Sequence, residues 1–167
     1  MTDDRSRTYT WADPLPQAKK GLAVDGLTYM QMMIAGEVDA PPIARTMGFD
    51  LVEVKKGYAR FEVVPQEFHY NPIGVVHGGL AATLLDSALG CCVHTTLAQG
   101  LGYTTLQLNV NLVRGITVDT GRLKCDGKVV HGGRQMATAE ATITDMNGKL
   151  YAHGTTTCLI FPLPEQG

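Results

Sequence analysis

The chain has 167 residues, 44% of them hydrophobic and 18% charged, which is enough for one well-buried domain and excludes extensive disorder. Its 14 basic and 16 acidic side chains give a net charge of −2, and this balance argues against nucleic acid or an anionic membrane as a partner. The most apolar segment, residues 80–98, is interrupted by Asp86 and His94, so we expect no membrane span. The four cysteines form no C-x-x-C pair and are expected to be reduced, which predicts a cytoplasmic protein.

Residues 1–42 are predicted to form an N-terminal arm and helix, ahead of a main domain at residues 43–163. Residues 1–20 show no periodicity and are expected to be an arm. Apolar residues at helical spacing predict a helix over residues 25–35, and Gly36 is expected to end it. Its methionine-rich stripe is expected to pack against the main domain, with a lid over a ligand as the alternative.

The main domain begins with a helical turn at 43–47 and continues as strands, one long helix and more strands. In the strand at 104–113, apolar residues at even positions are expected to share one face. Asn147-Gly148 predicts a tight hairpin between the last two strands, and short connections require antiparallel pairing. The other predicted strands cover residues 49–54, 58–64, 121–130, 134–145 and 149–161, and the helix covers residues 78–97.

The predicted helix at 78–97 is apolar almost all round, so it has to be enclosed by the rest of the domain. A curved antiparallel sheet wrapped around one long central helix satisfies this requirement. The expected fold class is therefore α+β with the hot-dog architecture, preceded by an extra N-terminal helix.

One sector of this helix is polar, and it contains the carboxylate of Asp86. At 3.6 residues per turn the sector spans about 100°. A carboxylate in such a setting is costly unless it is satisfied or used, so Asp86 is a candidate general base or nucleophile in a cleft. The alternative is a solvent-exposed edge with a merely solvated carboxylate. The other polar or small residues of the sector are Thr83, Ser87, Gly90 and His94.

The segment just before the helix places Asn71 and His77 next to the pair Gly78-Gly79. Two glycines at a helix N-terminus let backbone N–H groups approach a ligand oxygen, and the helix dipole favours negative charge there. These are the features of an oxyanion hole. The alternative is a Gly-Gly turn that only admits the chain into the helix, with Asn71 and His77 fixing the loop.

Gly78 and Asp86 are eight residues apart, so about 12 Å separates them along the helix axis. One carbonyl group cannot contact both an oxyanion donor and a base at that separation. If both act on one substrate they must come from different chains, which predicts an active site across the interface of a two-fold homodimer.

Other chemistries find little support in the sequence. The two serines lie outside any G-x-S-x-G motif, and there is no P-loop, dinucleotide-binding or H-E-x-x-H pattern. The five histidines are scattered over several predicted elements, so neither a metal site nor a cofactor is expected.

The pattern Asn-x-x-Gly-x-x-His-Gly-Gly-x-x-x-x-x-x-x-Asp, from Asn71 to Asp86, resembles the hot-dog thioesterase superfamily, specifically its phenylacetate-pathway (PaaI-like) group. The similarity extends over roughly residues 43–161. It implies hydrolysis of an acyl- or aryl-CoA thioester to the free acid and CoA. A non-catalytic acyl-CoA-binding protein of the same fold is the alternative, and the resemblance does not identify the acyl group.

The resemblance also implies a role for each residue of the motif. Asp86 would be base or nucleophile, and the Gly78 N–H would hold the oxyanion with support from His77. Asn71 would position the water or the thioester. Members of the family often add a Ser or Thr at the start of the strand after the helix.

That position corresponds to Thr105, with Thr104 as the alternative. Gly79 would also contact substrate, and CoA phosphates would lie near Lys128, Arg134 and Arg114. The family forms dimers with shared sites, and these dimers pair into homotetramers.

Overall fold

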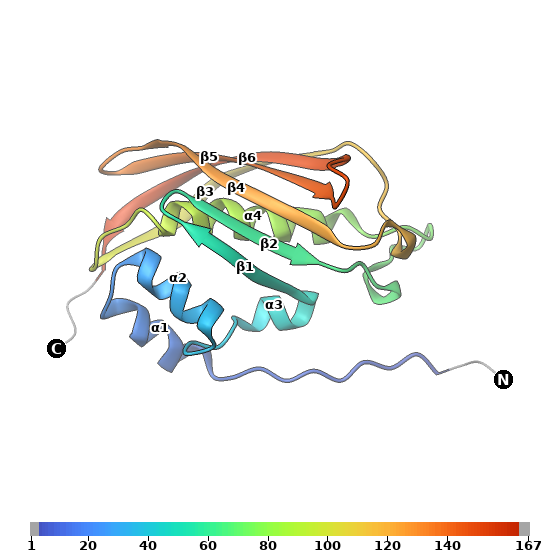
Figure 1. Cartoon of the computed structure of the whole chain (residues 1–167), viewed down its shortest axis with the longest axis horizontal. Coiled ribbons are helices and arrows are strands. Elements are labelled where there is room, and N and C mark those ends of the chain that lie inside the picture. Colours follow the sequence, from blue (N-terminus) through green and yellow to red (C-terminus); the bar gives the residue numbers. More distant parts are fainter. Residues whose placement is uncertain (1–3, 164–167) are drawn as a thin grey trace.

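Helix α4 (Gly78–His94) lies against one face of a six-stranded antiparallel sheet, as Figure 1 shows. This structure is a computed structural model, and it describes residues 4–163. The strand order is β1-β2-β4-β5-β6-β3, so β1 and β3 form the two edges. The strands are β1 (Phe49–Lys55), β2 (Tyr58–Val63), β3 (Leu101–Leu112), β4 (Leu123–Gly132), β5 (Met136–Asp145) and β6 (Leu150–Pro162). The predicted α+β hot-dog fold is confirmed.

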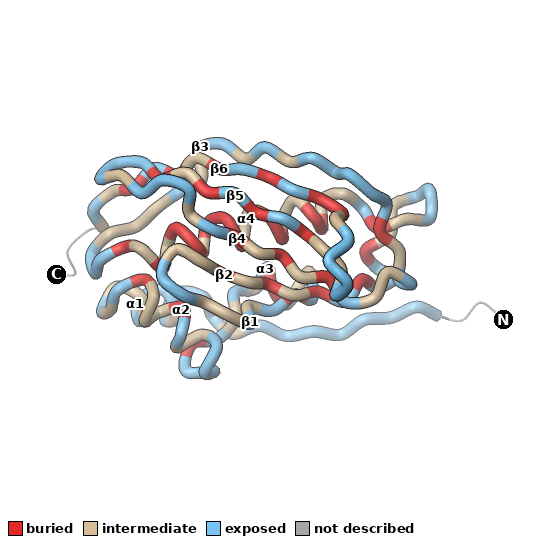
Figure 2. Tube along the Cα trace, turned by 45° about the horizontal axis from the view of Figure 1, so that its top comes forward, coloured by how far each residue is buried: buried red, intermediate tan, exposed pale blue. Residues whose placement is uncertain are grey.

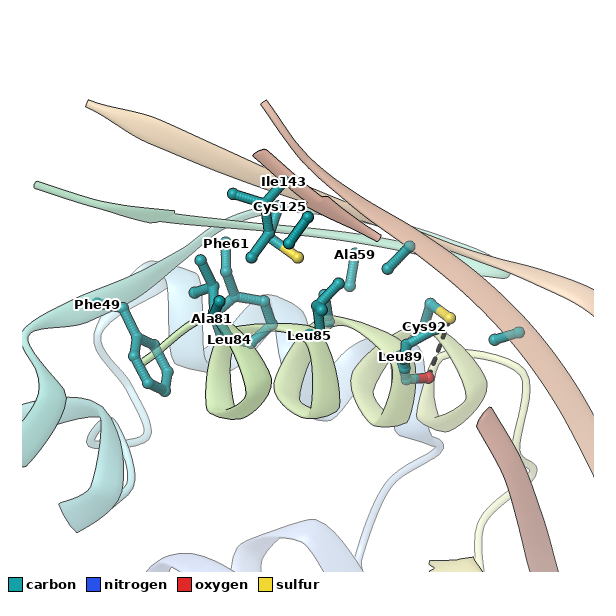
Figure 3. Close-up of a cluster of buried hydrophobic side chains, with 14 of the residues drawn as sticks. Phe49, Ala59, Phe61, Ala81, Leu84, Leu85, Leu89, Cys92, Cys125 and Ile143 are labelled. Atoms are coloured by element: carbon teal, nitrogen blue, oxygen red, sulfur yellow. Dashed lines mark hydrogen bonds between the residues drawn. The ribbon is translucent and has the colours of Figure 1, made fainter. Parts of the chain in front are cut away.

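The core forms where α4 meets the sheet. In Figure 3, leucines of α4 point toward side chains such as Phe61 of β2 and Ile143 of β5, and Leu84, Leu85 and Leu89 are at most 1% exposed. Figure 2 shows buried segments along α4 and the strands that cover it. Burying each such side chain stabilises the fold by about 1.5–3 kcal/mol, so the position and rotation of α4 are fixed by its apolar face.

Three short helices precede the sheet, where the sequence predicts one helix and a helical turn. Helix α2 (Gly26–Ala35) and helix α3 (Pro42–Met47) match the two predicted segments, and Gly36 ends α2 with a φ of 78°. The expectation of an arm without helix up to residue 20 is wrong, because α1 (Pro14–Leu22) lies there. Asp13 caps it by accepting a hydrogen bond from the Leu15 N–H, and a proline occupies its first turn. This capping signal was available in the sequence.

Helix α4 ends at His94, three residues before the predicted end. The Thr95 hydroxyl donates to the Cys92 carbonyl at 2.7 Å and accepts from the Gly57 N–H at 2.7 Å, so this side chain ties the helix end to the β1–β2 turn. Strand β3 then starts at Leu101, three residues earlier than predicted. Within residues 4–163, no helix is both long and apolar enough to cross a membrane.

The expectation of a regular alternation along β3 is wrong, because a β-bulge lies between Thr105 and Gln107. Thr105 pairs with Cys158 and Gln107 with Thr157, so Leu106 is the extra residue, and it is 57% exposed. The bulge places Thr105 and Leu108 on the same side of the sheet, the side that faces α4. It therefore positions the Thr105 hydroxyl toward the helix.

Candidate active site

The carboxylate of Asp86 is partly buried on α4 and has a partner on β3. The Thr105 hydroxyl donates a hydrogen bond to Asp86 Oδ1 at 3.0 Å, while the neighbouring Thr104 is exposed. This bond holds one carboxylate oxygen. Within residues 4–163 no partner is found for the other oxygen, which is available to take a proton or to attack a carbonyl carbon. The geometry thus distinguishes between the two threonines, since Thr105 alone contacts the carboxylate.

The first turn of α4 presents a backbone donor. The His77 ring caps the helix: its Nδ1 accepts from the Gly79 N–H at 2.8 Å. In the neutral ring Nε2 then carries the proton, and because His77 is exposed this N–H can donate to a ligand. Among residues 4–163, no acceptor is found for the Gly78 N–H, which lies at the positive end of the helix dipole. Gly79 is engaged with His77, so Gly78 is the residue suited to hold an oxyanion.

Both glycines lie close to a neighbouring side chain. A Cβ on Gly79 would lie 2.8 Å from His77 Nδ1, so the capping bond needs glycine there. A Cβ on Gly78 would lie 2.6 Å from Cδ1 of Leu112, near the end of β3. Leu112, which the sequence analysis did not single out, therefore packs directly over Gly78.

The loop before α4 is fixed by the side chain of Asn71 and by a backbone hydrogen bond between His77 and His69. Oδ1 of Asn71 accepts from the N–H groups of Ile73 and Val75 at 3.1 and 3.3 Å. The His77 N–H donates to the carbonyl of His69 at 2.8 Å, and His69 itself is buried. The amide oxygen of Asn71 thus fixes the loop, which was the alternative role considered for this residue. Its NH₂ group remains available for contact with substrate or water.

A hollow of about 270 Å³ opens beside the start of α4. Asn71, His77, Gly78, Leu112 and Arg114 all line it. Asp86 does not, because eight residues of helix place it about 12 Å along the axis. Within one chain, the Gly78 N–H and the Asp86 carboxylate therefore lie at two separate places along α4.

The predicted CoA-binding residues are dispersed. Lys128 lies on the sheet face that points away from α4 and pairs with Glu140 at 2.9 Å. Arg134 is exposed in the connection between β4 and β5. Arg114 alone of these cations lines the hollow at Gly78. Within the described residues, no group of three or more His, Cys, Asp or Glu is placed to hold a metal ion.

Comparison with known proteins gives the family. A model of the thioesterase superfamily matches residues 73–152, which include His77, Gly78, Asp86 and Thr105. A Halobacterium salinarum protein that carries an esterase name is 30% identical over 116 residues, which cover 66% of this chain and 75% of that protein. The chain belongs to the thioesterase superfamily. It is accordingly a thioester hydrolase, and α1, α2 and α3 precede the segment that the family model matches.

Two solved structures resemble this thioesterase at the level of both fold and sequence. A phenylacetic acid degradation-related protein from Ralstonia eutropha JMP134 is 29% identical, with a TM-score of 0.71, and the match covers 78% of this chain and 98% of that one. A Streptococcus mutans UA159 protein solved bound to acetyl CoA is 28% identical, with a TM-score of 0.63, over 70% of this chain and 91% of that one. The resemblance to the PaaI-like group of hot-dog thioesterases is confirmed.

Proposed function

We propose that this thioesterase hydrolyses acyl-CoA thioesters at a site that two subunits share, with Asp86 from one subunit and the Gly78 N–H from the other. The observation that carries the proposal is the arrangement on α4: an oriented carboxylate with a free oxygen, and an unpaired N–H about 12 Å away on the same helix. An antiparallel pairing of two α4 helices would bring the two halves together twice, in two equivalent sites.

The Gly78 N–H would stabilise the oxyanion that forms when the thioester carbonyl is attacked. In one route, Asp86 takes a proton from water and the resulting hydroxide adds to the carbonyl carbon. The C–S bond then breaks and the CoA thiolate receives the proton, which yields the free acid and CoA. In the other route, the carboxylate itself attacks, releases CoA and forms an anhydride that water hydrolyses. A single turnover in ¹⁸O-water identifies an anhydride that water opens at the Asp86 carbonyl carbon, because only that route labels Asp86.

The remaining motif residues would serve this centre. Thr105 orients the carboxylate, and the Nε2–H of His77 would donate to the substrate beside the oxyanion. Asn71 would act through its NH₂ group, and Gly79 would help by letting His77 cap the helix. Thr104, which faces away from Asp86, is a weaker candidate for substrate contact than Thr105.

The substrate is proposed to be a CoA thioester because a homologous structure holds acetyl CoA and because Arg114 lines the hollow at Gly78. A guanidinium group suits the phosphates of CoA. Lys128 and Arg134 remain candidates to contact CoA phosphates in a dimer or tetramer. Lys128 would first have to break its ion pair with Glu140.

A homodimer is supported by the free edge of β3. This strand spans twelve residues, and its exposed leucines Leu106 and Leu112 lie on the edge that no other strand of residues 4–163 covers. An uncovered strand edge with apolar side chains favours pairing with another chain. The pairing of such dimers into a homotetramer is part of the proposal, on the resemblance to the family.

A cytoplasmic location is also proposed. The four cysteines carry free thiols, and Cys92, Cys125 and Cys158 are buried in the core. Unpaired thiols are typical of proteins from reducing compartments. Trapping free thiols in intact cells with a membrane-permeant reagent, followed by mass analysis, tests this expectation.

The test of the reaction is Asp86→Asn, which keeps the shape of the side chain and its bond to Thr105 while removing the carboxylate. With butyryl-CoA as substrate, kcat should fall by about 10²–10⁴-fold, while butyryl-CoA binding and Tm stay close to wild type. The matched control is Asp119→Asn, at an exposed position in the 3-10 helix Val118–Thr120. Thiol release at the wild-type rate from Asp86→Asn would remove this carboxylate from the mechanism. Saturable binding without thiol release by wild-type protein would favour the non-catalytic alternative.

A further inference from the structure

The extended segment at residues 4–12, called the arm below, lies against the C-terminal end of α3. Figure 1 shows it extending from α1 past α3. The Arg7 side chain of the arm donates hydrogen bonds to two carbonyls at the end of α3, that of Thr46 and, at 2.8 Å, that of Arg45. The last carbonyls of a helix lack partners within the helix and lie at its negative end, so a guanidinium group suits this place.

The same guanidinium group lies on the loop before α4. It is 4.0 Å from the centre of the Phe68 ring, in the 3-10 helix Glu67–His69, and 4.8 Å from the centre of the Tyr9 ring on the arm itself. A planar guanidinium group can stack on aromatic rings and donate hydrogen bonds in its own plane at the same time. The Phe68 ring is in turn 4.2 Å from the His69 ring. Arg7 therefore joins the arm, the end of α3 and the loop.

The loop passes this support on to the start of α4. Nε2 of His69 donates to the carbonyl of Met47, the last residue of α3, at 2.8 Å. The backbone carbonyl of His69 accepts from the N–H of His77, the N-cap of α4, at 2.8 Å. Arg7 and His69 thus bind consecutive carbonyls at one helix end, and His69 also holds the residue that precedes Gly78.

Arg7 also favours the protonation state in which His69 makes these bonds. The ring has to be neutral, because its Nδ1 accepts from the Gln66 N–H while its Nε2 donates to Met47. Burial lowers the pKa of His69, and the positive charge of Arg7 acts in the same direction.

Building on the proposed function, we propose that Arg7 is a positioning residue for the Gly78 N–H of its own chain. It binds α3 and the loop, and it acts on the reaction only through the place of this donor. Because the proposed site takes its carboxylate from the other chain, the effect of Arg7 belongs to the chain that supplies the oxyanion donor. The arm precedes residues 73–152, the segment that the family model matches.

The experiment places Arg7→Met on one or the other chain of a mixed dimer. Chains that carry Asp86 are refolded with about a tenfold excess of Asp86→Asn chains, so that nearly all of them pair with a chain that lacks the carboxylate. Each such dimer has one working site, with the carboxylate from the minority chain and the Gly78 N–H from the excess chain. Thiol release from butyryl-CoA is then measured per Asp86-carrying chain.

With Arg7→Met on the excess chains, kcat should fall about tenfold, while KM should stay within about twofold, because a displaced oxyanion donor weakens binding of the transition state. With Arg7→Met on the minority chains, kcat should stay within about twofold of the unsubstituted mixture. A general loss of folding would lower activity in this second arrangement as well. Arg7→Lys, whose ammonium group cannot stack and donate in one plane, should give a smaller loss in the first arrangement only.

The matched control is Arg45→Met on the excess chains, which should leave kcat unchanged. It removes an exposed arginine side chain from the same end of α3 and keeps the carbonyl that accepts from Arg7. The inference is overturned if Arg7→Met leaves kcat unchanged on the excess chains, or lowers it equally on either chain. A loss confined to the minority chains would place both groups in one chain, which overturns the shared site but supports the role of Arg7. The mixture without any change at Arg7 tests the proposed function by itself.

Discussion

At the scale of single residues, the hydrogen bond from Thr105 to Asp86 decides how the carboxylate is presented. Thr105→Val keeps the side-chain shape and removes the donor. A hydrogen bond to a charged group contributes about 1.5–3 kcal/mol, so kcat for butyryl-CoA should fall about 10–100-fold with little change in KM. Steady-state kinetics check this expectation, with Thr104→Val on the exposed side of the strand as control. An equal loss in both variants would assign the effect to strand structure.

His69 is expected to make the loop before α4 sensitive to pH. Its Nδ1 accepts from the Gln66 N–H at 3.0 Å and its Nε2 donates to the Met47 carbonyl at 2.8 Å, so the bonded ring is neutral. Burial lowers the pKa of His69 below its ordinary value of 6.5. Between the lowered value and 6.5, the unfolded chain binds more protons than the folded one. The stability that this histidine contributes is therefore complete above about pH 6.5 and is lost as the pH falls through that value.

We accordingly expect the free energy of unfolding, measured with urea, to decrease from about pH 8 to about pH 5. His69→Gln should lower stability at pH 8 and make this decrease shallower. The control is His131→Gln, at an exposed position, which should leave the slope as it is. An unchanged slope in His69→Gln would show that other groups set the acid sensitivity. His94, which is half-buried and whose pKa burial also lowers, is the next candidate.

At the scale of elements, the sequence predicts most of the fold because the strongest signals are local. The apolar faces of α4 and the hairpin between the last two strands are visible in the chain itself, and the structure has both. The connection between β5 and β6 spans residues 146–149, however, and not only the predicted two-residue turn Asn147-Gly148. The bulge at Leu106 was not predictable in this way, because it depends on pairing with β6, which is distant in the chain. This error matters for function, since the bulge sets the side of the sheet on which Thr105 lies.

The features of the candidate site that lie on a single helix could be predicted from the sequence. The contacts between different elements could not. The spacing between Gly78 and Asp86 on a helix follows from the sequence alone. The packing of Leu112 over Gly78 and of Tyr103 over Gly90 does not, because each contact joins β3 to α4 across the curvature of the sheet. The helix α1 was missed for a different reason. Leu15, Ala18 and Leu22 stand at helical spacing, but the stripe is short and none of its residues is buried, and the capping signal before it was not used.

The contact between β3 and α4 at Gly90 predicts that Gly90→Ala lowers stability in the wild-type protein but raises it in the Tyr103→Val variant. In wild-type protein, Gly90→Ala should destabilise by about 1–3 kcal/mol, because the added methyl group meets the Tyr103 hydroxyl and ring. In Tyr103→Val, which vacates that space, the same substitution should stabilise by about 0.5–1 kcal/mol through the helix propensity of alanine. Urea unfolding of the four proteins gives the coupling energy. Additive effects would show that Tyr103 and Gly90 do not share this space.

At the scale of the whole molecule, the proposed shared site predicts that one chain is inactive alone. Asp86 and the hollow at Gly78 lie at different places along α4, and the exposed edge of β3 runs beside both. Pairing at this edge would also cover Leu112, which packs over Gly78. Dimer formation would then bring the carboxylate of one chain next to the Gly78 N–H of the other chain.

Complementation between two inactive variants tests this shared site. Asp86→Asn removes the carboxylate, and Gly78→Pro removes the N–H without breaking the helix, since proline is tolerated in the first turn and His77 has the extended backbone that precedes proline. The proline ring introduced by Gly78→Pro would displace Leu112, so Leu112→Ala is included in that chain and tested separately as its control.

Each variant alone should be nearly inactive with butyryl-CoA. After joint unfolding and refolding, half of the dimers are mixed, and each mixed dimer holds one site with both native groups. Activity should therefore recover to about a quarter of the wild-type value. Recovery requires that the two groups come from different chains. A mixture that stays inactive, although mass analysis shows mixed dimers, would place both groups within one chain and contradict the shared site.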